Sequence, residues 1–409
     1  MKNCRYLLNL LLFFLLFTAT FTSCRKDDTP EYDYFIDNRL EATYTETYIS
    51  SILSYAVATY PELAELQDFI SDGVNIYKVV YNTRVNGDNI IASGLVSIPA
   101  TPGEYPVLSF QNGTNTKNSN CPSNNPLSID YQFVEFIASM GFVVIIPDYP
   151  GFGNSSEIPH PYLIAEPTIQ SITDMFRAVS EAGDARFPGV KTKNEYYLLG
   201  YSQGGWATMT LHKALEVGYS PEFNLKSSVC GAGPYDMYNL FLGMSSLSTY
   251  PMPSYIGYII NAYSEYDQFS NKVTELMNEP YASRLSSLYN GTLTTSEIND
   301  KLTTSIPGLL KQDFISGFSG SSAYSTVRQG LISNSISPWN THKPVLMVHG
   351  SGDTHVNVST TETMYAAMIN AGTSTSILTK IILPDLDHGD ALIPCMTEGL
   401  KFLINLRNQ

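Results

Sequence analysis

One six-residue stretch, Gly200-Tyr-Ser-Gln-Gly-Gly205, constrains the fold of this chain more than any other. It follows the short apolar run Glu195–Leu199 and precedes Trp206–Val217, a segment rich in helix-forming residues. A strand that turns this sharply into a helix holds the residue at the apex, Ser202, in a strained backbone conformation, and the glycines two positions either side leave room there. We therefore predict a strand–turn–helix unit with Ser202 as a candidate nucleophile. The alternative is a glycine-rich turn with an incidental serine.

Length and composition indicate a folded chain with a large core. The 409 residues suggest about two domains, or one α/β domain with insertions. Hydrophobic residues make up 43% and charged residues 15%, which is typical of a globular protein. The formal net charge of −15 argues against nucleic acid or an anionic membrane surface as the main partner, because both need a basic face. An acidic surface favours neutral substrates.

The amino terminus predicts export. Lys2 and Arg5 precede a nearly unbroken apolar run, Tyr6–Phe21, which is shorter than the ~20 residues that a membrane-spanning helix needs. We therefore expect residues 1–23 to be a signal peptide. The ending Phe21-Thr-Ser-Cys24 resembles a bacterial lipobox, and this resemblance implies that Cys24 becomes a lipidated amino terminus. Ordinary secretory cleavage is the alternative.

The residues after Cys24 extend this prediction. Arg25-Lys-Asp-Asp28 resembles the short charged tags that send some Gram-negative lipoproteins to the cell surface. The two resemblances imply an outer-membrane or cell-surface lipoprotein that contacts the membrane only through its lipid anchor. Residues 24–45 are polar and tyrosine-rich, and we expect them to form a tether.

Three cysteines follow the predicted signal peptide and Cys24: Cys121, Cys230 and Cys395. An odd number excludes a fully paired disulfide framework. A disulfide between Cys121 and Cys395 stays open for an exported protein, because sequence does not set connectivity. No CxxC or histidine-rich spacing indicates a metal site.

Hydrophobic periodicity predicts an α/β core. Two β-rich segments, 74–82 and 90–98, flank Asn86-Gly87, a dipeptide that favours a hairpin turn, so we expect an antiparallel sheet edge there. Strands then alternate with helices, which implies parallel strands joined by crossover helices. The strands are expected at 107–110, 143–146, 196–199, 225–230, 344–348 and 376–383, and the helices at 129–139, 168–182, 203–217, 360–371 and 391–406.

About a hundred residues between the strands at 225–230 and 344–348 break this alternation. They are helical in pattern, aromatic and rich in methionine. We therefore predict an α/β core of residues 46–234 and 341–409 with a mainly helical cap of residues 235–340, inserted at the carboxyl end of a central strand. Two short helices are expected between residues 44 and 70, separated at Pro61.

Candidate partners for Ser202 follow two later strands. A serine becomes a good nucleophile when a base takes its proton and an acid orients that base, and such groups collect at the carboxyl ends of the strands in these sheets. Asp353 follows the strand at 344–348 and His388 follows the last strand, so the predicted triad is Ser202, Asp353 and His388 in chain order. Asp385 and Asp387 are alternative acids. The remaining histidines are interpreted as surface or structural residues: His160, His212, His342, His349 and His355.

The oxyanion of a tetrahedral intermediate needs two preorganised donors. The backbone N–H of Gln203, directly after the candidate nucleophile, is the expected first donor. The loop after the strand at 107–110 is expected to supply the second, from the N–H of Thr114 or Gly113.

A Gly-x-Gly stretch within Asp148–Ser156 also follows a strand and could suggest a dinucleotide loop. Such a loop needs a helix that begins beside it and meets the pyrophosphate with its amino terminus. Because Pro159 and Pro161 intervene, we interpret the stretch as a structural loop that lines the site.

Residues 75–405 resemble α/β-hydrolases, in particular the secretory lipase and esterase branch. Three features carry this resemblance: the strand–turn–helix unit at 200–205, which we call the elbow, the Asp-Tyr-Pro-Gly-Phe-Gly loop at 148–153, and the long insertion before Asp353. The resemblance implies an α/β-hydrolase fold with a mostly parallel sheet between layers of helices. It also implies hydrolysis of carboxylic esters through an acyl-enzyme, without a cofactor.

Aromatic residues of the insertion either line a pocket or form the insertion's own core. From them we expect only a hydrophobic group near the scissile bond, such as a fatty or aromatic acyl group, and surface anchoring also admits esterified polysaccharide. The sequence sets neither the acyl group nor the oligomeric state. These aromatic residues are Tyr235, Tyr238, Phe241, Tyr250, Tyr255, Tyr258, Tyr263, Phe269, Phe314, Phe318 and Trp339.

Two other functions compete with ester hydrolysis. A serine peptidase of the prolyl oligopeptidase type shares this catalytic domain, but it carries a large β-propeller before it, for which this chain has too few residues. A non-catalytic surface-binding lipoprotein is the second, and the intact set of Ser202, Asp353 and His388 argues against it.

Overall fold

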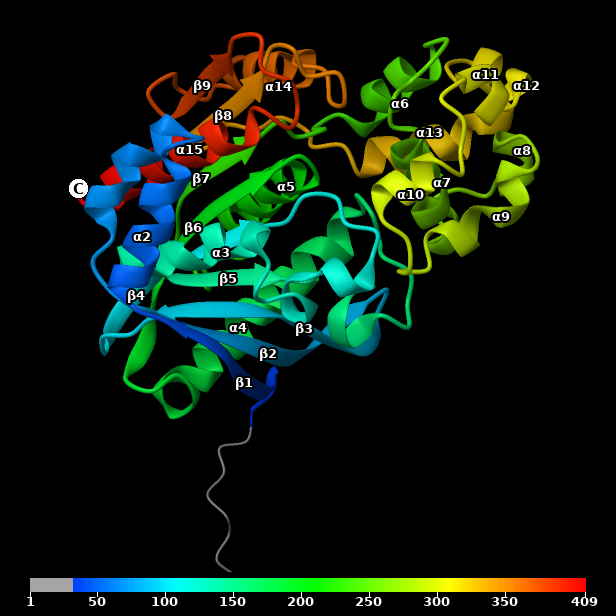
Figure 1. The fold of residues 1–409 in the computed structure, drawn as a ribbon. Helices are drawn as coiled ribbons and strands as arrows, with labels where there is room; N and C mark the ends of the chain where they lie inside the picture. The colour runs from blue at the N-terminus through cyan, green and yellow to red at the C-terminus, as the bar shows by residue number, and fades with distance from the viewer. Residues whose placement is uncertain (1–31) are drawn as a thin grey trace, which may run out of the picture. The chain divides into compact units, whose positions relative to one another are not determined.

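A nine-stranded sheet organises residues 34–409 of the computed structural model, which describes residues 32–409 (Figure 1). The predicted signal peptide, Cys24 and the first residues of the predicted tether lie outside the described residues. The strand order is β1-β2-β3-β5-β4-β6-β7-β8-β9. The strands are β1 (Phe35–Tyr44), β2 (Val74–Val85), β3 (Asp88–Pro99), β4 (Gly103–Gln111), β5 (Val143–Pro147), β6 (Val190–Tyr201), β7 (Leu225–Gly231), β8 (Val345–Gly350) and β9 (Leu378–Leu383).

The antiparallel part of the sheet contains the predicted hairpin and one strand that the sequence did not predict. Asn86 and Gly87 form the turn between β2 and β3 with φ of 52° and 86°, as a two-residue hairpin requires. The predicted tether is wrong from Phe35 onward, because β1 pairs antiparallel with β2 at the edge of the sheet. Most residues of this edge strand are exposed or half-buried, so it lacks the apolar alternation by which strands are predicted.

The rest of the sheet confirms the predicted parallel arrangement. Strands β4 to β9 pair in parallel, while β3 joins β5 antiparallel. The register places Gln111 of β4 opposite Gly200 of β6, and Gly231 of β7 opposite Val348 of β8. The carboxyl ends of these four strands therefore meet at one edge of the sheet, where the loops after them come together.

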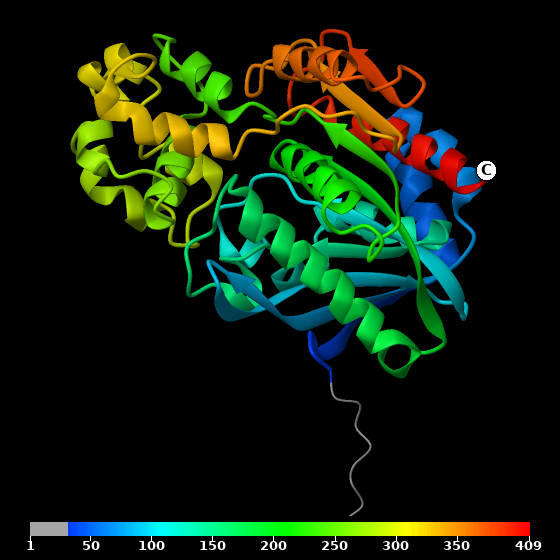
Figure 2. The same cartoon turned by 180° about the vertical axis from the view of Figure 1, so that it is seen from behind.

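Helices cover both faces of the sheet. One face shares an apolar core with α2 (Glu46–Ala56), the 3-10 helix η1 (Pro61–Phe69), α3 (Ile129–Glu135), its 3-10 continuation η4 (Phe136–Met140) and α15 (Leu392–Arg407). The opposite face carries α4 (Ala165–Arg186) and α5 (Gln203–Val217), which lie in front in Figure 2. Helix α14 (Ser359–Asn370) packs beside β8 and β9. These helices match the predicted ones, except that the helix after Pro61 is 3-10.

Eight short helices, α6 to α13, lie between β7 and β8 and are grouped to one side of the sheet (Figures 1 and 2). We call residues 237–333 the helical insertion. Eight of the eleven aromatic residues considered above are buried, and the other three are Tyr238, Tyr255 and Trp339. Most of them therefore form a core. The helices are α6 (Met237–Ser245), α7 (Pro253–Glu265), α8 (Val273–Leu276), α9 (Tyr281–Leu288), α10 (Thr295–Asn299), α11 (Ile306–Leu309), α12 (Gln312–Gly317) and α13 (Ser325–Ser333).

The three cysteines of the described residues, Cys121, Cys230 and Cys395, are buried free thiols. The disulfide between Cys121 and Cys395 that the sequence left open is thus absent from residues 32–409. Within the same residues, every helix is too short or too polar to cross a membrane.

Candidate active site

The turn between β6 and α5 holds Ser202 in a strained conformation, with φ 60° and ψ −122°. Such a conformation costs on the order of 1–3 kcal/mol and persists only where the surroundings hold it. Here the N–H of Ser202 donates to the carbonyl of Gly231 over 2.9 Å, and the Ser202 carbonyl accepts from the N–H of Trp206 over 3.1 Å. The strand on one side and the helix on the other therefore fix the turn.

Three glycines let the elbow pack this closely. A methyl group added at Gly200 would collide with the carbonyl oxygen of Gly204, and one added at Gly204 would collide with that of Gln111. These collisions supply the steric reason for the two glycines predicted around the serine. Gly205 has the same requirement, because its missing side chain leaves room for the carbonyl oxygen of Gly231. The elbow thus lies in direct backbone contact with the ends of β4 and β7.

Ser202, His388 and Asp353 form one hydrogen-bonded line. The Oγ of Ser202 lies 2.9 Å from Nε2 of His388, and Nδ1 of His388 lies 2.5 Å from Oδ2 of Asp353. Because the Asp353 carboxylate can only accept a hydrogen bond, Nδ1 of His388 carries the proton, and Nε2 is free to accept a hydrogen bond from the Ser202 hydroxyl. Tyr201, which precedes the serine, donates its hydroxyl to the carbonyl of His388 over 2.8 Å. This bond ties the loop of the histidine to β6.

The carboxylate of Asp353 is buried and fully hydrogen-bonded. Its Oδ1 accepts from the backbone N–H groups of His355 and Val356, and its Oδ2 accepts from Nε2 of His349 as well as from His388. Burial by itself disfavours the charged form, but the hydrogen bonds from the two histidines and from the backbone outweigh it and hold the pKa of Asp353 well below its usual range. Asp353 is therefore an anion at neutral pH.

The alternative acids have other contacts. The Oδ1 of Asp387 accepts from the backbone N–H groups of Gly389 and Asp390, both over 2.8 Å, which closes the turn of the histidine loop. Asp385 stands at a positive φ of 59° in the same loop, and its N–H donates to Ser351. Of the three carboxylates considered from sequence, the structure places Asp353 against His388.

The other histidines have different surroundings. His212 is completely buried and bonded to Ser228 and Thr341, as expected for a structural residue. The ring of His355 lies 5.0 Å from that of His388, centroid to centroid, and its Nδ1 is buried with no hydrogen-bond partner among residues 32–409. His160 is buried against Gln203. His355 follows Asp353 by two residues in the sequence, but the sequence carried no signal for the proximity of His160 to the site.

Both expected sources of oxyanion donors lie beside Ser202. Gln203 is the first residue of α5, and the first N–H groups of a helix have no partner within it. The loop after β4 follows Gln111, whose carbonyl oxygen lies directly against Gly204 of the elbow. Gly113 and Thr114 belong to this loop. Which of the two supplies the second N–H stays a prediction.

The loop that resembles a dinucleotide fingerprint has a structural role. Asp148 is buried and accepts hydrogen bonds from the N–H of Ser123 and the hydroxyl of Ser93. Burial raises the pKa of Asp148 despite these bonds. Gly153 stands at φ 60°, where any side chain would meet the Asp148 carboxylate. The next α-helix begins only at Ala165, so no long helix points its amino terminus at this loop.

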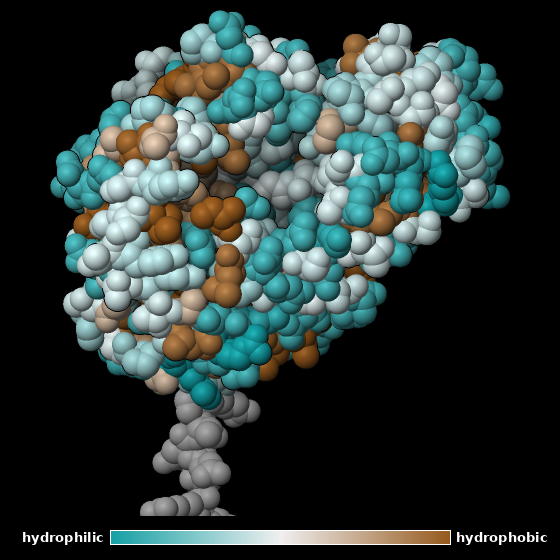
Figure 3. Space-filling view, in the orientation of Figure 1, coloured by the Kyte–Doolittle hydropathy of each residue, from teal (hydrophilic) through white to brown (hydrophobic). Residues whose placement is uncertain are grey.

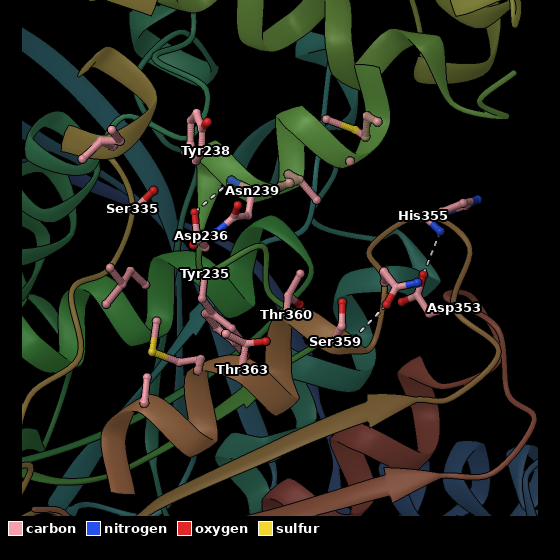
Figure 4. A pocket seen from close by; sticks show the side chains of 18 of the residues that line it. Tyr235, Asp236, Tyr238, Asn239, Ser335, Asp353, His355, Ser359, Thr360 and Thr363 are labelled. Atoms are coloured by element: carbon pink, nitrogen blue, oxygen red, sulfur yellow. Dashed lines mark hydrogen bonds between the residues drawn. The ribbon is translucent and has the colours of Figure 1, made fainter. Parts of the chain in front are cut away.

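A cavity of about 940 Å³ lies beside Asp353 and His355. We call it the α6–α14 cavity, since these two helices line it together with segment 332–338 and the loop around Asp353. In the view of Figure 4, Asp353 and His355 stand at one side of it and Tyr238 and Ser335 at the other. Figure 3 shows the surface hollowed between the sheet and the helical insertion.

A much smaller cavity, of about 20 Å³, lies in front of Ser202 and Gln203. It shares four lining residues with the α6–α14 cavity, namely Leu240, Met244, Tyr250 and His355. The two spaces are therefore neighbours.

Residues 123–387, more than half of the chain, match the family described as secretory lipase. The chain belongs to the secretory lipase family. It is accordingly an ester hydrolase of the lipase and esterase type, which confirms the predicted activity, and the family's description indicates export. The peptidase and non-catalytic alternatives find no support. Comparison with curated proteins gives no match.

Solved structures are similar to this secretory lipase over most of their length. A putative hydrolase from Legionella pneumophila is 24% identical, with a TM-score of 0.82 over 92% of this chain and 99% of that one. The ligand-bound rice cell wall degrading esterase LipA from Xanthomonas oryzae is 24% identical, with a TM-score of 0.77 over 93% of this chain and 98% of that one. Candida antarctica lipase A in its closed state is 15% identical, with a TM-score of 0.63 over 90% of this chain and 82% of that one. These likenesses confirm the predicted α/β-hydrolase fold.

Proposed function

We propose that this secretory lipase hydrolyses carboxylic esters by serine catalysis, with Ser202 as nucleophile, His388 as general base and Asp353 as the acid that orients the base. The observation that carries the proposal is the continuous line of hydrogen bonds from Ser202 Oγ through the His388 ring to Asp353 Oδ2, at 2.9 and 2.5 Å. Both distances lie within the reach that proton transfer and orientation require.

The geometry supports a two-step reaction. As Ser202 Oγ attacks the ester carbonyl carbon, His388 Nε2 takes the hydroxyl proton, and Asp353 stabilises the resulting imidazolium without being protonated. When the tetrahedral intermediate collapses, His388 gives this proton to the leaving alcohol and the acyl group stays on Ser202. Water then attacks the acyl-enzyme with His388 again as base, which releases the acid and restores the serine.

Two backbone N–H groups are proposed to stabilise the oxyanion of each intermediate: that of Gln203 and that of Thr114 or Gly113. The helix amino terminus adds a partial positive charge at the first of these positions. Removal of one such donor costs roughly 2.7–4 kcal/mol in other hydrolases, so we expect each donor to contribute about 10²- to 10³-fold to the rate.

The α6–α14 cavity supports a substrate with a hydrophobic acyl or aryl group. It lies beside Asp353 and His355, and its lining includes the apolar side chains of Met244, Leu247 and Ile336. We propose that residues 235–340 act as a cap over the α/β core of residues 46–234 and 341–409, since the walls of the cavity come from both. One structural neighbour is described as a cell wall degrading esterase, which keeps polysaccharide esters among the candidates.

A fluorophosphonate probe tests the proposal, because it labels an activated serine covalently. We expect labelling of the wild type and of Ser51→Ala, whose serine is exposed on α2 far along the chain from the elbow, and none of Ser202→Ala. Labelling of Ser202→Ala at the wild-type rate would refute the assignment. A panel of p-nitrophenyl esters with increasing acyl length, together with acetyl and feruloyl esters, then identifies the acyl group.

We also propose that Cys24 carries lipid and anchors the enzyme at the outer surface of a Gram-negative cell. The lipobox-like ending of the apolar amino-terminal run and the family's description as secretory support this. Incorporation of an alkyne-tagged fatty acid in the expressing cells should be lost in Cys24→Ser and kept in Cys121→Ser. Equal incorporation in both variants would contradict the assignment.

A further inference from the structure

The segment Pro159–Leu163 runs from the loop after β5 to the start of α4 and contacts the elbow through His160. Nδ1 of His160 lies 2.8 Å from the carbonyl oxygen of Pro150, and Nε2 lies 3.0 Å from Nε2 of Gln203. A carbonyl oxygen only accepts, so Nδ1 carries the proton, and Nε2 accepts from the side-chain amide of Gln203. Burial lowers the pKa of His160 to about 4, which keeps the ring neutral and this arrangement intact above that pH.

The same segment contacts the second expected oxyanion loop through Tyr162. The hydroxyl of Tyr162 lies 2.9 Å from Oγ1 of Thr114. Two residues that are separated by a single position in the sequence thus hold the two segments that should supply the oxyanion donors. Gln203 and Thr114 follow different strands, β6 and β4, and among residues 32–409 no direct hydrogen bond joins their side chains.

Helix α7 of the helical insertion supports this segment from outside. The ring of Tyr258 stacks on that of Tyr162, with centroids 4.2 Å apart and planes at 8°. Tyr266 donates its hydroxyl to the carbonyl of Pro159 over 2.5 Å, and Tyr263 donates to that of Leu163 over 3.0 Å. Two tyrosines of α7 and Tyr266, the residue directly after it, therefore contact three of the five residues of this segment.

We propose that the segment Pro159–Leu163 is a positioning element of the active site: His160 orients Gln203, Tyr162 orients Thr114, and α7 braces both. The inference rests on the proposed serine mechanism. Oxyanion donors act only when they stand 2.7–3.1 Å from the developing charge, and a misplacement of about 1 Å lowers the rate by about 100-fold. Two hydrogen bonds flank the strained peptide between Ser202 and Gln203. The N–H of Ser202 donates to the carbonyl of Gly231, and the side-chain amide of Gln203 donates to His160.

Two substitutions of His160 separate positioning from general packing. His160→Gln places an amide oxygen near the position of Nε2 and keeps an acceptor for Gln203, whereas His160→Asn keeps a donor toward Pro150 and loses that acceptor. We expect kcat to fall by about 10- to 100-fold in His160→Asn with KM nearly unchanged, and to recover most of its value in His160→Gln. The inhibition constant of a trifluoromethyl ketone, which forms an oxyanion on the enzyme, should rise in parallel with the loss in kcat/KM.

Gln203→Met provides the second measurement, because it keeps the backbone N–H and removes only the side-chain bond to His160. We expect the same loss as in His160→Asn and no further loss in the double variant, since both remove one interaction. Tyr162→Phe, which keeps the stacked ring, should cost less, about 3- to 10-fold in kcat, as expected for one neutral hydrogen bond.

Losses that add in the double variant, or a folded His160→Asn with wild-type kcat, would overturn the inference. Failure of the mechanism itself is distinguishable, because then the wild type would show no Ser202-dependent reaction with fluorophosphonate. If His160→Asn does not fold, the comparison of Gln203→Met and Tyr162→Phe with the wild type decides the outcome.

Discussion

The strand ends that carry Ser202, His388 and Asp353 and the helical insertion beside them are built on different principles. At the strand ends, backbone groups meet without intervening side chains, and the carboxylate of Asp353 has four hydrogen-bond donors. The insertion consists of short helices held by buried aromatic rings, and Gly243 of α6 has open space where a side chain would stand. The proposed catalytic groups therefore lie in the region that tolerates least change, while the walls of the α6–α14 cavity, where we propose that substrate binds, come in part from the region that tolerates more.

The largest effect that would test this difference between the two regions is expected from a change of the proposed acid, Asp353. Asp353→Asn should lower kcat by about 10³- to 10⁴-fold, because the amide cannot hold His388 in the correct tautomer or stabilise its charged form. Asp387→Asn is the matched control, since Asp387 lies one residue from the histidine and only closes its own turn. We expect less than a threefold change for it by steady-state hydrolysis of p-nitrophenyl butyrate. Equal losses in both variants would remove Asp353 from its proposed role.

Backbone contact gives the next largest effect. Gly204→Ala should destabilise the protein by about 3 kcal/mol or more, because the new methyl group collides with the carbonyl of Gln111. Gly243→Ala, in the open position on α6, should be neutral or stabilising by up to about 1 kcal/mol through helix propensity. Urea unfolding measures both. A tolerated Gly204→Ala would show that the elbow is less tightly packed than the structure indicates.

The α6–α14 cavity can be tested by filling it. Ala367→Phe introduces a ring from α14 into this space, so kcat/KM for an octanoyl or feruloyl ester should fall by about 10-fold relative to an acetyl ester. Hydrolysis of the acetyl ester is the internal control, because a general loss of folding would lower both rates. An unchanged ratio would place the acyl group elsewhere.

The smallest expected effect concerns stability and pH at Glu135 of α3. Both carboxylate oxygens are buried without a hydrogen-bond partner among residues 32–409, and burial raises the pKa of Glu135 to about 8 from an ordinary value of 4.5. Between these values the folded protein holds a proton that the unfolded chain has released, so this group makes stability fall as the pH rises toward 8.

Glu135→Gln removes this dependence. We expect its Tm to exceed that of the wild type at pH 8, by roughly 1 °C for each kcal/mol that the wild type has lost in a unit of this size, and to match it near pH 4.5. Glu104→Gln, an exposed change at the start of β4, serves as the control. A Tm difference that is independent of pH would show that Glu135 is ionised in the folded protein.

Features that depend on residues close together in the chain could be predicted from the sequence, and features that depend on residues far apart in the chain could not. Strands β2 to β9 and their helices were predicted because their apolar residues repeat with a local period, and Ser202, Asp353 and His388 were nominated because each follows a strand whose carboxyl end meets the others. Strand β1 was mistaken for a tether because an exposed edge strand has no such period. Its pairing depends on β2, some forty residues away in the chain.

By itself, therefore, the sequence of this secretory lipase determined where most of its strands lie along the chain and the edge of the sheet at which a serine, a histidine and an aspartate would gather. Only the tertiary structure decided that two tyrosine-braced residues, His160 and Tyr162, would reach Gln203 and Thr114, and that α6 and α14 would leave a cavity between them. Local periodicity encodes which face of an element is buried. The partner that a buried polar side chain finds is set by packing between elements that are distant in the chain, and no local pattern records it.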